Sequence, residues 1–202
     1  MTIIRQQDLI DSVADALQYI SYYHPVDFIQ AVKQAYDREE SKAAKDAMAQ
    51  ILVNSRMCAM GHRPICQDTG IVTVFVRVGM NVQWQGDMSL TDMINQGVRQ
   101  AYIHPDNVLR ASILSDPDGE RKNTGDNTPA VIHYDIVQGD KVSIDVAAKG
   151  GGSEAKSKFA MLNPSDSVVD WVLKMVPTMG AGWCPPGMLG IGIGGTAEKA
   201  ML

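Results

Sequence analysis

The chain has 202 residues, of which 45% are hydrophobic and 20% charged, and its 23 acidic and 18 basic side chains give a net charge of -5. This composition excludes wholesale disorder, and the length suits one large domain or two small ones. The negative charge argues against nucleic-acid binding. The sequence lacks both a membrane-spanning run of roughly 20 apolar residues and the apolar core of a signal peptide, so we expect a soluble, cytoplasmic protein with no membrane partner.

Three helices are predicted in the first sixty residues. Apolar residues recur every three or four positions between Gln7 and Ile20, which is typical of a helix with one buried stripe. Pro25 suits the first turn of a second helix, and residues 41–59 form a third, alanine-rich segment. Because the connections are short, we expect the three helices to form an antiparallel cap over residues 1–60, mainly as scaffold.

Strands are predicted beyond Gly70. Residues 71–78 are β-branched and long enough for a central strand, and residues 130–137 and 141–146 are predicted to form a hairpin with Gly139 in its turn. Helical spacing returns over residues 88–101 and 165–176, the latter capped by Ser165 or Asp166. The predicted fold class is α/β in the mixed α+β sense, with the helical cap followed by a mixed sheet flanked by helices over residues 61–202.

The end of the chain has two unusual features. More than half of the 18 glycines lie from Gly150 onward, a density that suggests loops around a small ligand. Thr196 is a good N-cap for the helix formers that follow it, but six residues are too few for a stable helix. We therefore expect this chain to be a fragment of a longer protein.

Two of the three cysteines stand where a loop can present a thiol to a cleft. Cys66 comes just before the strand predicted at Ile71, and an inert thiol and a functional one are both open interpretations. Cys184 precedes two prolines, whose rigidity suits a metal ligand. Cys58 is expected to pack within the third helix. The four histidines show no zinc-ligand spacing and are interpreted as structural.

Three further segments could bind an anion or a nucleotide. The run Gly150–Gly152 could curl its N–H groups around a carboxylate or phosphate, or be a plain surface turn. Arg110 could clamp a carboxylate with two hydrogen bonds or form a surface ion pair. The segment Gly190–Gly195 matches G-x-G-x-x-G, but prolines occupy the place of the preceding strand and no acidic ribose ligand follows. A nucleotide-binding module on this segment is an alternative of another class.

Four motifs occur together along the chain: C-Q-D-T-G at 66–70, N-V-L-R-A at 107–111, K-G-G-G-S-E at 149–154, and C-P-P-G at 184–187 followed by G-I-G-I-G-G-T. In this combination the chain resembles the N-terminal domain of the class I, iron–sulfur-dependent fumarate hydratases and the related α subunit of L-tartrate dehydratase. The resemblance covers nearly the whole chain from P-I-C-Q-D-T-G onward. It implies a hydro-lyase that interconverts fumarate and L-malate, a reaction of the tricarboxylic acid cycle.

The resemblance also implies a cofactor and partners. Cys66 and Cys184 would be two of three cysteine ligands of a 4Fe–4S cluster, whose open iron acts as a Lewis acid on the substrate hydroxyl. The third cysteine of the family lies beyond Leu202, and a separate C-terminal domain carries other catalytic residues of a homodimer. We therefore expect the fragment alone to have little hydratase activity and no stable cluster, which anaerobic reconstitution and a fumarate assay would check.

The remaining motif residues receive roles from the same resemblance. Arg110 and the Gly150–Gly151 loop would bind the second substrate carboxylate, and Gln67 would hydrogen-bond the substrate. Asp68 would assist proton transfer or hold the true base. The open alternatives are an L-tartrate dehydratase α subunit or another 2-hydroxy-dicarboxylate dehydratase, and a structural or interaction domain that keeps its cysteines without a cluster.

Overall fold

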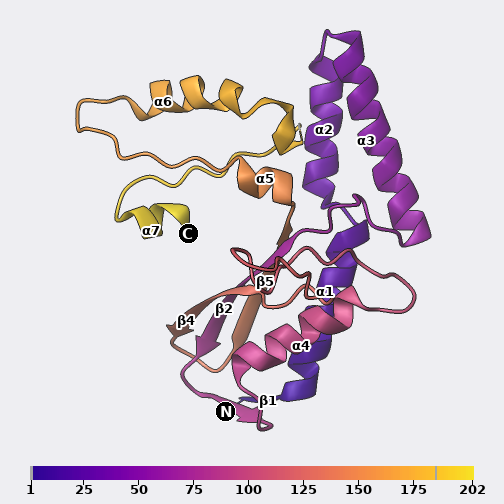
Figure 1. Cartoon of the computed structure of the whole chain (residues 1–202), viewed down its shortest axis with the longest axis vertical. Coiled ribbons are helices and arrows are strands. Elements are labelled where there is room, and N and C mark those ends of the chain that lie inside the picture. Colours follow the sequence, from indigo (N-terminus) through magenta and orange to yellow (C-terminus); the bar gives the residue numbers. More distant parts are fainter. Residues whose placement is uncertain (1, 185) are drawn as a thin grey trace. The chain divides into compact units, whose positions relative to one another are not determined.

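The computed structural model describes residues 2–184 and 186–202, and it confirms the mixed α/β class (Figure 1). The chain divides into two compact units, Met1–Gly150 and Gly151–Leu202, which we call the first and the second unit and describe separately. The first unit contains, in chain order, β1 (Thr2–Arg5), α1 (Gln6–Tyr22), α2 (Val26–Arg38), α3 (Lys42–Gly61), β2 (Ile71–Gly79), β3 (Val82–Gln85), α4 (Leu90–Tyr102), β4 (Val131–Val137) and β5 (Val142–Lys149).

The core of the first unit lies on one face of a three-stranded sheet with the order β4-β2-β5. The central strand β2 runs parallel to β4 and antiparallel to β5. Its alternate residues Val72, Val74 and Val76 are almost completely buried, as expected for β-branched side chains in a central strand. Helices α1 and α4 supply the other buried side chains of this core, together with Leu109 from the segment after α4.

The predicted hairpin of β4 with β5 is wrong, because β2 lies between the two strands. The connection from β4 to β5 instead crosses the end of β2, where the Gly79 amide donates to the Lys141 carbonyl at 2.8 Å and the Asn81 amide donates to the Gly139 carbonyl at 2.9 Å. A Cβ on Gly79 would lie 2.6 Å from the Gly139 carbonyl oxygen, so a glycine is required at this crossing. The turn residues had indicated where the chain reverses, but not which strand each arm joins.

Helix α1 belongs to the sheet's core rather than to a cap. Its Val13 and Leu17 side chains are buried against the sheet, and the Gln18 amide donates to the Ala101 carbonyl of α4 at 2.6 Å. A Cβ on Gly97 of α4 would lie 2.7 Å from the Ile10 carbonyl oxygen, so the two helices cross at close range. This arrangement differs from the expected three-helix cap over residues 1–60, since only α2 and α3 pair as a separate hairpin.

Local capping explains where these helices begin. The Ser41 hydroxyl accepts from the Ala44 amide at the start of α3, and the Ser89 hydroxyl accepts from the Asp92 amide at the start of α4. Pro25 is the N-cap of α2 and so stands one position before the first turn.

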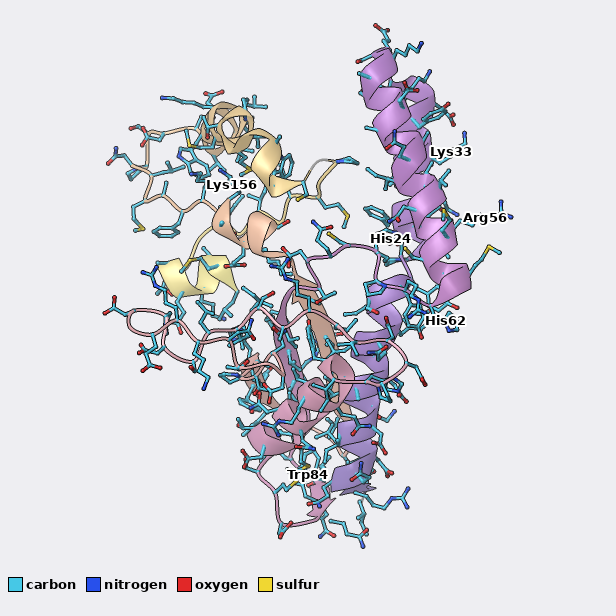
Figure 2. All side chains as sticks on the ribbon, turned by 45° about the vertical axis from the view of Figure 1, so that its right-hand side comes forward. His24, Lys33, Arg56, His62, Trp84 and Lys156 are labelled. Carbon is cyan, nitrogen blue, oxygen red and sulfur yellow. The ribbon has the colours of Figure 1, made fainter. Side chains whose placement is uncertain are left out.

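His24 precedes α2 and His62 follows α3, so both lie at the same end of the α2–α3 hairpin (Figure 2).

A second, two-stranded sheet was not predicted. Strand β1 pairs in parallel with β3, with Ile4 opposite Trp84. Trp84, which Figure 2 labels, packs against a small cluster formed by Leu9, Ile10 and Met93. Each strand has only four residues, which leaves a weak signal in the sequence.

The second unit consists of α5 (Gly151–Ala155), α6 (Val168–Met175), the 3-10 helix η1 (Val176–Trp183) and α7 (Ala197–Met201). Ser167 caps α6, so the expected cap at Ser165 or Asp166 is wrong, whereas the predicted cap at Thr196 is confirmed. None of the described residues of this unit is buried. In the described part of the whole chain, no helix is long and apolar enough to cross a bilayer.

Candidate functional site

The loop from Cys66 to Gly70 joins α3 to β2 and packs directly against the end of β5. Gly70 has a φ of 87°, and a Cβ there would lie 2.7 Å from the carbonyl carbon of Ala148, so only glycine fits. The Oδ2 atom of Asp68 lies 3.3 Å from the position that a Cβ on Gly150 would occupy. The missing side chain at Gly150 therefore lets the Asp68 carboxylate approach the backbone at the end of β5.

The thiol of Cys66 is exposed on this loop. The backbone amide of Asp68 donates to the Cys66 sulfur at 3.4 Å, and the Gln67 side-chain oxygen lies 3.5 Å from the same sulfur. The sequence motif thus folds back on itself, with its polar groups gathered around one accessible sulfur. A soft sulfur ligand that accepts a backbone N–H bond is suited to binding a metal centre.

Arg110 is held beside the same loop through its backbone. The Thr69 hydroxyl donates to the Arg110 carbonyl at 2.8 Å. The Arg110 side chain is exposed, and among the described residues its guanidinium forms no hydrogen bond or ion pair. The five donors of this group therefore remain available to an anion such as a carboxylate.

Two buried residues that the sequence analysis missed fasten the Cys66–Gly70 loop. The Tyr102 hydroxyl donates to the Thr69 carbonyl at 2.6 Å and to the Gly70 carbonyl at 3.2 Å, and the Asn127 amide also donates to the Gly70 carbonyl, at 3.1 Å. Burial raises the pKa of Tyr102 to about 12, so the phenol stays a donor at neutral pH. The apolar spacing of α4 is compatible with a buried Tyr102. No local sequence pattern indicates that Tyr102 or Asn127 forms hydrogen bonds with the Cys66–Gly70 loop.

In the second unit, Gly152 lies next to Cys184. A Cβ on Gly152 would lie 2.6 Å from the Gly182 carbonyl oxygen and 3.7 Å from the Cys184 sulfur. The Ser153 hydroxyl donates to the Trp183 carbonyl at 3.4 Å. Gly151 and Gly152 form the start of α5 rather than the curled loop that we considered. Glycine here allows α5 to approach the cysteine-bearing segment closely.

Cys184 itself is exposed and has a left-handed backbone, with φ 61° and ψ 64°. Cys58, by contrast, is buried in α3 as expected, with its sulfur 3.5 Å from the Asn54 side-chain oxygen and from the Pro64 carbonyl oxygen. The two exposed thiols are thus the two that the motifs single out. The described residues contain no group of three or more histidine, cysteine or acidic side chains that could hold a metal ion by themselves.

The predicted site residues divide between the units. The first unit holds the cysteine loop, the arginine and one glycine, namely Cys66, Gln67, Asp68, Arg110 and Gly150, and the second unit holds Gly151 and Cys184. That the two thiols share one site stays a prediction. The segment Gly190–Gly195 leads into α7, and the described residues of the second unit contain no strand before it, which leaves the dinucleotide pattern without its βα context.

Comparison with known proteins adds independent findings. A family model described as "Fumarate hydratase (Fumerase)" matches residues 10–202. The "Putative L(+)-tartrate dehydratase subunit alpha" of Methanocaldococcus jannaschii is 32% identical over 197 residues, which are 95% of this chain and 68% of that protein. The "L(+)-tartrate dehydratase subunit alpha" of Escherichia coli O157:H7 is 31% identical over 195 residues, 95% of this chain and 64% of that protein. The chain thus spans about two thirds of the length of these relatives.

Proposed function

The chain belongs to the fumarate hydratase (Fumerase) family of hydro-lyases. We propose that it supplies substrate-binding and cofactor-binding residues to an enzyme that catalyses the reversible hydration of fumarate to L-malate. One observation carries the proposal: the Cys66 thiol, the Asp68 carboxylate and the Arg110 backbone are joined in one loop cluster of the first unit. Since the relatives are longer than this chain, the activity is proposed for the assembled enzyme.

Each residue of the cluster has a task that its chemistry suits. Arg110 would bind one carboxylate of the diacid through two parallel N–H donors. Gln67 would donate a hydrogen bond from its side-chain amide to the substrate. The Asp68 carboxylate lies close to the backbone at Gly150, so backbone groups there would lie near the bound substrate. Asp68 would hold or move the proton that is exchanged when water adds to the double bond.

An iron–sulfur cluster would be held by Cys66 and Cys184. The donor set fits this group, because both sulfurs are exposed and the Cys66 sulfur accepts a backbone N–H bond of the kind that tunes such clusters. When bound, a 4Fe–4S cluster with an open iron supplies a Lewis acid for the substrate hydroxyl, which is a poor leaving group. A third thiolate would come from outside the described residues.

A second candidate is the dehydration of L-tartrate or another 2-hydroxy-dicarboxylate, which the names of the relatives favour. Those names also refer to alpha subunits, so we propose that this chain works with a further domain or subunit. Arg110 would serve equally with tartrate, because both diacids carry two carboxylates. Cytoplasmic location and a homodimeric assembly belong to the same proposal.

The test is a substrate panel on the assembled enzyme, with fumarate, L-malate and L-tartrate. Arg110→Gln should raise KM roughly tenfold to hundredfold, the range expected for lost hydrogen bonds to a charged group. Arg121→Gln changes another exposed arginine of the first unit; it is the control and should change KM little. Equal effects of the two substitutions would contradict the role of Arg110.

The cluster is tested separately by its visible absorption after anaerobic reconstitution with iron and sulfide. Cys66→Ser and Cys184→Ser should each lose both the absorption and the activity, whereas Cys58→Ser should keep both, because Cys58 is buried in α3. Activity that survives in Cys66→Ser and Cys184→Ser would show that the thiols are incidental. A chain that turns over none of the three diacids in its assembled form would refute the proposed function.

A further inference from the structure

Asn127 is the most completely buried asparagine of the described chain. Its exposed fraction is 0%, and its backbone lies in the left-handed region with a φ of 61°. A buried amide needs partners for both its oxygen and its nitrogen. Asn127 has both, and its two partners belong to the two segments that carry the candidate site.

The nitrogen end of Asn127 reaches the cysteine loop. Its Nδ2 atom donates to the Gly70 carbonyl at 3.1 Å, at the point where that loop enters β2. Its Oδ1 atom accepts from the Ser112 amide at 2.7 Å, two residues after Arg110. One side chain therefore ties the end of the Cys66–Gly70 loop to the segment that carries Arg110.

The position of Asn127 is in turn set from α4. The preceding carboxylate, Asp126, accepts from Arg99 Nε of α4 at 2.7 Å and from the Thr128 hydroxyl at 2.7 Å. Burial tends to raise the pKa of Asp126, but the hydrogen bonds from Thr128 and Arg99 outweigh it and lower that pKa overall. Asp126 is therefore a carboxylate at neutral pH and keeps this anchor.

Tyr102, the last residue of α4, reaches the same carbonyl. Its hydroxyl shares the Gly70 oxygen with Asn127 and also donates to the Thr69 carbonyl. The rigid helix α4 thus fastens the loop at two neighbouring positions. A network in which every buried polar group is paired specifies one arrangement of the segments that it joins.

We propose that Asn127 is a positioning residue that sets the placement of Arg110 relative to the Cys66–Gly70 loop, with Tyr102 as its second fastening. This inference rests on the proposed function in one respect: the proposed function is what assigns Arg110 and the Cys66–Gly70 loop to the same substrate. Because its side chain is completely buried, Asn127 is assigned no contact with substrate or cofactor. It acts by preventing the two segments from moving apart.

The first test is hydrogen exchange on the chain itself, which needs neither substrate nor cluster. In Asn127→Ala and Asn127→Gly, exchange over residues 66–72 and at the Ser112 amide should accelerate about five- to tenfold, as for a lost hydrogen bond of about 1 to 1.4 kcal/mol. Exchange within β4 should stay unchanged. Asn107→Ala is the matched control, because this buried asparagine bonds to Gln18 and Ser21 of α1 and not to the loop.

The glycine variant separates the side chain from the backbone. Glycine adopts the left-handed conformation without strain, so Asn127→Gly removes the amide and keeps the turn. If Asn127 were required only for its backbone, this variant would exchange like the wild type while Asn127→Ala would not. That result, or acceleration of exchange over residues 66–72 in Asn107→Ala, would overturn the proposal.

Tyr102→Phe keeps the test decisive if the Asn127 variants do not fold. It removes only the hydroxyl that donates to the loop, and it should accelerate exchange over residues 66–72. The matched control is Tyr134→Phe, which removes an exposed hydroxyl bonded to Thr91 and should leave that segment unchanged. Unchanged exchange in Tyr102→Phe would count against the fastening.

The second test is a KM-against-kcat comparison on the assembled enzyme. If Asn127 positions Arg110, Asn127→Gly should raise KM for the diacid in the same direction as Arg110→Gln, and the double variant should be less than additive. Unchanged KM despite faster exchange in the loop would overturn the positioning role. If the wild-type enzyme hydrates no diacid, the proposed function fails, and the exchange measurement alone still decides whether Asn127 joins the two segments.

Discussion

The Thr69 hydroxyl donates a hydrogen bond of 2.8 Å to the backbone carbonyl of Arg110, across 41 residues of sequence. This bond joins the Cys66–Gly70 loop to the segment that carries Arg110, the residue proposed to bind a substrate carboxylate. Neither residue is buried, so the bond is accessible to substitution without disturbing the core.

Thr69→Val should therefore test the junction directly. The substitution keeps the shape of the side chain and removes the hydroxyl, and we expect the free energy of unfolding to fall by about 1 kcal/mol, the usual net value of one hydrogen bond. Urea unfolding measures it. Thr73→Val on β2 is the control, and it should change stability by less than half as much, since no hydrogen bond of the Thr73 hydroxyl is seen among the described residues. Equal losses in the two variants would contradict the junction.

Gly70→Ala should be far more damaging than a change at another left-handed glycine. Both Gly70 and Gly125 have positive φ, but a Cβ on Gly70 would lie 2.7 Å from the Ala148 carbonyl carbon, whereas a Cβ on Gly125 would meet nothing within 4 Å. We expect a loss of about 3 kcal/mol in Gly70→Ala and about 1 kcal/mol in Gly125→Ala, where only backbone strain acts. Thermal or urea unfolding compares them, and similar losses would mean that the loop does not pack against β5.

The stability of the α2–α3 region should fall in mild acid because of His24. Burial lowers the pKa of His24, whose Nδ1 lies 3.0 Å from the Ser55 hydroxyl, so the folded state favours the neutral ring. The unfolded chain binds its proton near an ordinary pKa of about 6.5. The contribution is therefore complete above about pH 6.5 and is lost as the pH falls through the folded-state pKa.

The measurement is urea unfolding of wild type and His24→Asn at about pH 7.5 and about pH 5.5, on either side of that ordinary pKa. The wild type should lose more stability than the variant on acidification, because only the wild type must charge a half-buried ring. Parallel losses in the two proteins would rule out His24 as the source.

Limited proteolysis should attack the second unit first. None of its described residues is buried, so little apolar surface is removed from water and local opening should cost little free energy. We expect trypsin to cleave first after Lys158, in the segment between α5 and α6, and Lys158→Gln should delay that product. Lys33, ion-paired with Asp37 within α2, serves as the exposed reference site and should be cut later. First cleavage at Lys33 would contradict the prediction.

The sequence by itself determined the elements that have strong local signals. The valine-rich run of β2, the apolar spacing of α1 and α4, and the cap at Thr196 all depend on residues close together in the chain, and the structure confirms each of them. The motifs likewise singled out the two exposed cysteines, because glycines and prolines around them indicate constrained loops. The family resemblance, carried by the same motifs, is confirmed over residues 10–202.

Tertiary structure alone decided which elements meet. The sheet order is β4-β2-β5, so β4 and β5 do not form the expected hairpin. Strand β2 buries one face and pairs along both edges, and the turn residues between β4 and β5 do not indicate this position. In the same way, Asn127 and Tyr102 gained their roles from carbonyls 57 and 32 residues away at Gly70. Every residue has the same backbone carbonyl, so the local sequence does not reveal which distant donor will form a hydrogen bond with it.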